Sequence, residues 1–143
     1  MNKKACFKVN PSLRNNKLFE KGRDLDICYR LKVMLNSVGF EVGTNDLINE
    51  KESDIVFYLD YRKDFINSNS FKVLIALESI AVLPKTFDKS YTDKFDLVFT
   101  FLDDIVDNSR IFKINFSFVL DKEVGVLFKD KTKLLCNFSS NKF

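Results

Sequence analysis

The chain has 143 residues, of which 23 are basic and 20 are acidic, so its formal net charge is +3. This length fits one domain with a substantial core but is short for a two-domain enzyme. The charges alternate along the sequence and form no basic stripe, which argues against nucleic-acid binding driven by net charge. The sequence contains no histidine, which excludes His-dependent catalytic triads and Cys/His zinc sites.

The cysteines and the amino terminus give an expected location. Cys6, Cys28 and Cys136 lie far apart within apolar segments. This pattern is typical of buried free thiols in a reducing compartment. The amino terminus is basic but lacks the apolar stretch of a signal peptide, and no apolar run is long enough to span a bilayer. We therefore expect a cytoplasmic protein without a transmembrane segment, with peripheral attachment to the inner face of the membrane left open.

Six short apolar runs along the chain are predicted strands. They cover residues 5–9, 40–44, 54–59, 71–77, 97–101 and 111–116. Between the first two runs, from Asp24 to Val38, apolar residues recur at helical spacing, and Gly39 follows as a C-terminal cap. Polar or helix-capable segments separate most of the other runs.

The runs 54–59 and 71–77 are apolar almost without interruption. Such runs are typical of strands that are covered on both faces, as in parallel sheets. The alternation of strand and helix signals predicts an open α/β sheet, Rossmann-like and mostly parallel, with helices on both faces. A domain boundary is expected near residue 131. The apolar run 134–138 is a predicted strand without a following helix or a partner strand, which suggests the start of a second domain.

The glycines exclude the usual phosphate-binding loops. Only four glycines occur, and none belongs to a GxGxxG motif or a P-loop. These loops supply the backbone N–H groups that cradle phosphates. We therefore predict no cofactor-binding residue in this chain, and any nucleotide would be held elsewhere.

The acidic cluster Asp103, Asp104 and Asp107 could suggest a metal site, since hard cations prefer carboxylate oxygens. The cluster lies between two predicted strands, however, where a solvated turn or the acidic first turn of a helix would have the same composition. We favour these interpretations and predict no metal ligand.

Asp60 follows the third predicted strand, which is the position of the phosphoacceptor in a receiver domain. That chemistry also needs a pair of acidic residues after the first strand to hold magnesium. Asn10 and Pro11 stand there instead. The receiver interpretation is therefore disfavoured.

Glu78 directly follows the apolar run 71–77 and precedes the loop 79–87. Ligands of open α/β sheets gather at the carboxyl ends of the strands, where a partly desolvated glutamate can act as a general base. Position alone equally allows Glu78 to cap a neighbouring helix or to face water. Both roles remain open at this point.

The order of motifs around Glu78 is more specific than any single motif. Leu77-Glu78-Ser79 is followed by Lys94-Phe95-Asp96 before a strand, and then by aspartates at 103–107 before the next strand. In this order and spacing, residues 71–116 resemble the amino-terminal domain of family-ten glycosyltransferases, the α-1,3/4-fucosyltransferases and their bacterial relatives. Ile80 departs from the pattern, because many members have proline there.

The resemblance covers most of the chain. Residues 24–38 and 52–56 are similar to the preceding helix and strand of bacterial members, and residues 133–142 to the first strand of the donor domain. It implies a GT-B arrangement in which residues 1–131 form the Rossmann-like acceptor-side domain. Residues 132–143 would then begin a truncated donor-binding domain.

The resemblance also implies a reaction and its residues. The full enzyme would transfer a sugar, with fucose from GDP-fucose as the expected donor, to a glycan or lipopolysaccharide acceptor, with inversion and without an essential metal. Glu78 would deprotonate the acceptor hydroxyl, and Ser79 would lie near the acceptor. The missing domain would bind the nucleotide-sugar donor, so this chain alone would be inactive. The alternative is a non-catalytic α/β binding or interaction module derived from such a domain.

Overall fold

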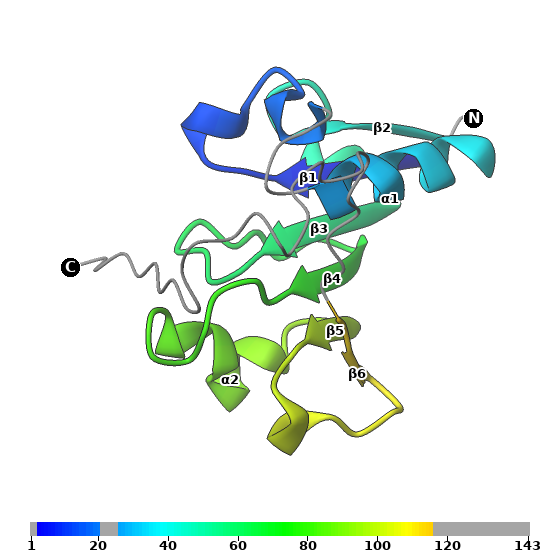
Figure 1. Cartoon of the computed structure of the whole chain (residues 1–143). Coiled ribbons are helices and arrows are strands. Elements are labelled where there is room, and N and C mark those ends of the chain that lie inside the picture. Colours follow the sequence, from blue (N-terminus) through cyan, green and yellow to red (C-terminus); the bar gives the residue numbers. More distant parts are fainter. Residues whose placement is uncertain (1–2, 21–25, 116–143) are drawn as a thin grey trace, which may run out of the picture.

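The computed structural model describes residues 3–20 and 26–115, in which six strands form one parallel sheet in the order β2-β1-β3-β4-β5-β6 (Figure 1). The strands are β1 (Lys3–Lys8), β2 (Phe40–Thr44), β3 (Ile55–Leu59), β4 (Phe71–Ile75), β5 (Leu97–Thr100) and β6 (Ile111–Lys113). Each overlaps one of the predicted apolar runs, and β2 has the predicted bounds. The open, parallel α/β sheet expected from the sequence is therefore confirmed.

The connections between the strands are less helical than predicted. Helix α1 (Asp26–Ser37) joins β1 to β2, and Gly39 follows it with a φ of 90°, as expected of a C-terminal cap glycine. Helix α2 (Lys89–Thr92) is a single turn before β5. The other regular segments are the 3₁₀ turns η1 (Pro11–Leu13), η2 (Lys17–Phe19), η3 (Glu50–Glu52), η4 (Pro84–Phe87) and η5 (Asp103–Ile105).

The connections form few helices because of their composition. The segment from Asn67 to Ser70 consists of asparagine and serine, and the β5–β6 connection is rich in aspartate. Side chains of these types bond to nearby backbone groups and so compete with helix formation. Among the described residues, only the β1–β2 connection therefore contains a helix of several turns.

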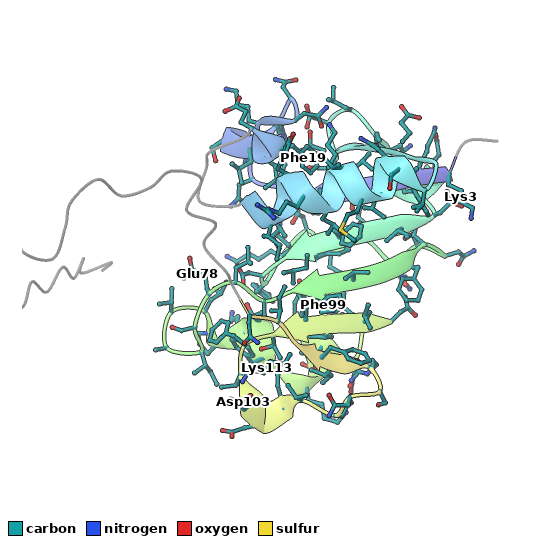
Figure 2. All side chains as sticks on the ribbon, turned by 45° about the vertical axis from the view of Figure 1, so that its right-hand side comes forward. Lys3, Phe19, Glu78, Phe99, Asp103 and Lys113 are labelled. Atoms are coloured by element: carbon teal, nitrogen blue, oxygen red, sulfur yellow. The ribbon has the colours of Figure 1, made fainter. Side chains whose placement is uncertain are left out.

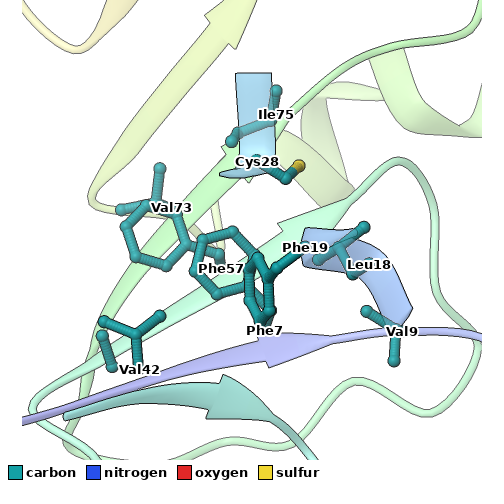
Figure 3. Close-up of a cluster of buried hydrophobic side chains, with 10 residues drawn as sticks. Phe7, Val9, Leu18, Phe19, Cys28, Val42, Phe57, Val73 and Ile75 are labelled. Carbon is teal, nitrogen blue, oxygen red and sulfur yellow. The ribbon is translucent and has the colours of Figure 1, made fainter. Parts of the chain in front are cut away.

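Alternate residues of the strands fill two cores, one on each face of the sheet. On the face covered by α1, Phe7 stacks on Phe57 with ring centroids 4.4 Å apart and meets Phe19 edge-on at 5.1 Å (Figure 3). The opposite face is covered by the other connections. Its buried side chains include Cys6, Ile48, Val56, Tyr58, Leu74, Tyr91, Phe95, Val98 and Ile111.

Every pair of neighbouring strands is parallel, so all carboxyl ends lie at the same edge of the sheet. From β1 the chain passes outward to β2 and then returns to β3 on the other side of β1. The strand order thus reverses between β1 and β3, and such a switch point is where doubly wound sheets bind ligands. We call the residues that directly follow the strand ends the carboxyl edge.

Two of the cysteines behave as expected. Cys6 and Cys28 are free and buried, and burial raises the pKa of both thiols to about 12. Neither is a reactive thiolate at neutral pH. Cys136, the apolar run 134–138 and the predicted domain start at 132–143 lie outside the described residues.

No helix within residues 3–20 and 26–115 is long and apolar enough to cross a membrane.

The stacked phenylalanines lead to a stability prediction. Replacing Phe7 by alanine removes a fully buried ring and leaves a cavity beside Phe19 and Phe57. We expect Phe7→Ala to lower the free energy of unfolding by about 3–5 kcal/mol. Val33→Ala, at a half-exposed position on α1, is the control and should change it by less than about 0.5 kcal/mol. Urea unfolding measures both, and equal effects would contradict this description of the core.

Candidate functional site

Glu78 lies at the carboxyl edge, three residues after the end of β4. Ala76 still belongs to the sheet, because its N–H donates to the carbonyl of Phe99 at 2.8 Å. Leu77 and Glu78 then leave the sheet, and the Glu78 side chain is half-buried. Figure 2 shows Glu78 at the end of the sheet toward which the arrowheads point. The sequence prediction for its place along the strand therefore agrees with the structure.

Ser79 directly follows and starts a tight turn. Its carbonyl accepts the N–H groups of Val82 at 3.0 Å and Leu83 at 2.9 Å. The backbone after Glu78 therefore curls back although Ile80 replaces the proline of the resembling family. Ser79 is half-buried, whereas Ile80 and Val82 are exposed.

The helix-capping alternative for Glu78 does not hold for the two helical segments that follow it. The segment η4 begins after Leu83, and α2 begins after Asp88. Glu78 is therefore the N-cap of neither. Its half-buried position at the carboxyl edge suits a group that meets a ligand, as a general base must.

Asp60 fixes the backbone from which Glu78 projects. It follows β3 with a φ of 57°, a left-handed conformation that aspartate tolerates better than most residues. Its Oδ1 atom accepts the N–H groups of Leu77 at 2.7 Å and Glu78 at 3.0 Å. Its own N–H donates to the carbonyl of Ile75 at 3.0 Å. Asp60 therefore ties the end of β3 to the end of β4.

The charge of Glu78 also affects the pKa of the Asp60 carboxyl group. Burial is the main effect and raises the pKa of Asp60, and the negative charge of Glu78 adds to this rise. The two hydrogen bonds from backbone N–H groups act in the opposite direction. Asp60 and Glu78 thus form a pair of acidic groups, and the nearby charge of Glu78 makes the ionised form of Asp60 less favourable.

These bonds make a phosphoacceptor role for Asp60 a poor fit. The Oδ1 atom is already engaged by two backbone donors. After β1, Asn10 accepts a hydrogen bond from Arg62 and offers no carboxylate for magnesium. Asp60 serves here as a bridge between strands. Sequence reasoning missed this role, since only the adjacency of an aspartate to a strand end hinted at it.

The acidic cluster at 103–107 is used to form a turn. Asp107 Oδ1 accepts the N–H groups of Ser109, Arg110 and Ile111, each at 2.8 Å, and these bonds hold the pKa of Asp107 well below its usual range. Asp103 begins η5 and pairs with Lys113. Within the described ranges, no group of three or more side chains is arranged to hold a metal ion.

A shallow open pocket of about 320 Å³ is lined by Phe65, Asn67 and Lys94. Asn67 and Lys94 belong to the segments that lead into β4 and β5, so the pocket lies away from the carboxyl ends of these strands. The Lys94 ammonium already stands over the Phe65 ring at 5.2 Å and the Tyr91 ring at 5.7 Å. Because chemistry is expected at the carboxyl edge, we do not assign the site to this pocket.

Comparisons of the chain with protein-family models, with curated proteins and with solved structures found no match. The fold class rests on the described strands and their order. The family and the roles of Glu78 and Ser79 remain predictions from the sequence.

The bridge made by Asp60 predicts how two substitutions will differ. Asp60→Asn keeps an oxygen for both N–H groups and tolerates the left-handed backbone, but it removes the buried charge. Asp60→Gly also adopts this backbone without strain but removes both hydrogen bonds. We expect Asp60→Gly to lower the free energy of unfolding by about 1–3 kcal/mol, the usual cost of orphaned donors.

The effect of Asp60→Asn should depend on pH. Because the pKa of Asp60 is raised in the folded state, ionising this carboxyl costs stability as the pH rises from about 3.8 through the raised value. At pH 7 Asp60→Asn should therefore be at least as stable as the original chain, and this advantage should vanish below the usual carboxyl range. Urea unfolding between pH 3 and 7 checks this. The prediction is contradicted if the stability of Asp60→Asn relative to the original chain is lower at pH 7 than at pH 3.

Proposed function

We propose that this chain is the acceptor-side domain of an inverting glycosyltransferase and that Glu78 is its general base. The observation that carries the proposal is the position of Glu78: half-buried, three residues after β4 at the carboxyl edge, on a backbone held by Asp60. The order of motifs from residue 71 to residue 116, which resembles the α-1,3/4-fucosyltransferases, supports it further.

The donor would be a nucleotide sugar, GDP-fucose by the resemblance, and another domain would hold it. This chain has no glycine-rich loop to cradle a diphosphate. Its own task would be to present a hydroxyl group of a glycan or lipopolysaccharide. Such an acceptor would be met in the cytoplasm or at the inner face of the membrane.

The proposed reaction is a single displacement. A Glu78 carboxylate oxygen removes the proton of the acceptor hydroxyl while the hydroxyl oxygen attacks the anomeric carbon of the donor sugar. The new glycosidic bond forms as the bond from the anomeric carbon to the diphosphate oxygen breaks, and the nucleoside diphosphate leaves with the electron pair. The configuration at the anomeric carbon is thereby inverted. Ser79 would contact the acceptor and keep its hydroxyl beside Glu78.

Glu78→Gln tests the role of the base in a protein that joins this chain to a donor domain. Glutamine keeps the size and the hydrogen-bonding reach but cannot take the proton. We expect the rate of transfer to fall by about two to four orders of magnitude, with little change in donor binding. Glu52→Gln, at an exposed position of η3, is the matched control and should leave transfer unchanged.

Two outcomes of that experiment would count against the proposal. Near-normal transfer by the folded Glu78→Gln protein would make Glu78 structural. Absence of transfer in the unsubstituted joined protein, with acceptor binding retained, would favour the non-catalytic binding module.

The isolated chain gives a simpler test of the proposal that another domain binds the donor. Because it lacks a phosphate-binding loop, it should neither transfer fucose from GDP-fucose nor hydrolyse this donor. Release of GDP, followed by chromatography, measures both reactions. Turnover that copurifies with the chain would show that it contains more than the acceptor side.

A further inference from the structure

Lys8, the last residue of β1, is a buried lysine at the switch point. Its side chain is 5% exposed, and its Nζ atom lies 2.5 Å from Glu50 Oε1 and 3.2 Å from Asp64 Oδ2. Lysine is almost never buried without a partner, because its ammonium group loses hydration. Two carboxylates from separate connections thus compensate this one cation.

Arg62 brings a second cation to the same place from the end of β3. Its side chain is 13% exposed, and its guanidinium reaches across the switch point to the Asn10 side chain and to the Val9 carbonyl. The Nε and Nη2 atoms face Asp64, with distances of 3.0 Å to Oδ1 and 3.2 Å to Oδ2. This paired geometry is the one in which arginine recognises a carboxylate.

Asp64 differs from its partners in exposure. Its side chain is 56% exposed, and it comes from the β3–β4 connection, which has no helix or strand. The Arg62 hydrogen bonds, together with Lys8, lower the pKa of Asp64 to about 2. Two shielded cations therefore converge on a carboxylate that reaches in from the solvent side, at the switch point of the strand order, which is where doubly wound sheets bind ligands.

The charges around this place select the kind of ligand. Lys8 and Arg62 are balanced by Glu50 and Asp64, so withdrawal of Asp64 leaves one net positive charge. One carboxylate restores the balance, whereas a phosphate dianion exceeds it. Glu50 is 6% exposed, and its buried Oε2 atom has no hydrogen-bond partner among the residues that the structure describes. A buried acceptor of this kind calls for a donor, which a hydroxyl group on the ligand would supply.

We propose that Lys8 and Arg62 form a carboxylate-binding subsite, which Asp64 occupies when no ligand is present. The ligand is a hydroxy acid, whose carboxylate takes the place of Asp64 and whose hydroxyl donates to Glu50. This subsite stands independently of glycosyl transfer. If both hold, the acceptor is an acidic sugar, since Arg62 follows Asp60 by two residues along the same edge.

The test uses the chain itself, at pH 7 and constant ionic strength, with glycolate as the hydroxy acid and acetate as the matched acid without a hydroxyl. The NMR signal of the Arg62 Nε–H group reports binding. In the original chain glycolate should shift this signal saturably, and more tightly than acetate. In Asp64→Ala, which frees both cations, glycolate should bind at least tenfold more tightly. Asp64→Asn replaces this variant if the alanine form does not fold.

Thermal unfolding provides a second readout and a control. At a glycolate concentration ten times the dissociation constant, the unfolding equilibrium of Asp64→Ala should shift about tenfold toward the folded state. Asp93 is the matched control, because it also bridges two cations, Lys89 at 2.7 Å and Arg110 at 3.2 Å, but on an exposed surface. Asp93→Ala should gain no saturable binding.

Three results would overturn the proposal. Binding in Asp64→Ala but none in the original chain would make Asp64 a permanent structural partner. A response equal to that of Asp93→Ala would reduce the effect to general ionic screening. Equal affinity for glycolate and acetate would remove the hydroxyl partner assigned to Glu50.

Discussion

The bridge from Asp60 to the backbone of Leu77 and Glu78 organises the carboxyl edge of this protein. Neighbouring parallel strands cannot be joined by a short hairpin, so nothing in the chain connectivity holds their carboxyl ends together. Here one carboxylate oxygen does so, and the Tyr91 hydroxyl adds a bond to the Asp60 carbonyl at 3.2 Å. This bridge places a negative charge in a buried position, which is unfavourable and raises the pKa of Asp60. The position of Glu78 depends on this compromise.

The carboxyl edge carries two regions of opposite character. Around the ends of β3 and β4 lie the acidic groups of Asp60 and Glu78. At the switch point between β1 and β3 lie the cations Lys8 and Arg62, held by their own carboxylate partners. An acceptor hydroxyl would suit the first region and an acidic substituent the second. If both proposals hold, one acidic acceptor would contact both regions, and each proposal is tested separately.

The sheet could be predicted from the sequence, whereas the bonds of the site could not. Nearly continuous apolar runs such as 54–59 and 71–77 identify buried strands, because strands covered on both faces have this composition. The Asp60 bridge depends on a left-handed φ and on amides 17 and 18 positions away, and the Lys8–Glu50 pair joins residues 42 positions apart. No local pattern encodes these contacts. Glu78 was found by its place after a strand, and its role as a base stays a prediction.

The most direct measurement is a map of acceptor binding on the isolated chain. Neutral and acidic oligosaccharides are added to the ¹⁵N-labelled chain, and the shifts of its backbone amides are followed. We predict that the perturbed amides lie at the carboxyl edge, in residues 60–62 and 76–79. Perturbations centred on Phe65, Asn67 and Lys94, the residues of the shallow pocket, would contradict it, as would binding to none of the oligosaccharides.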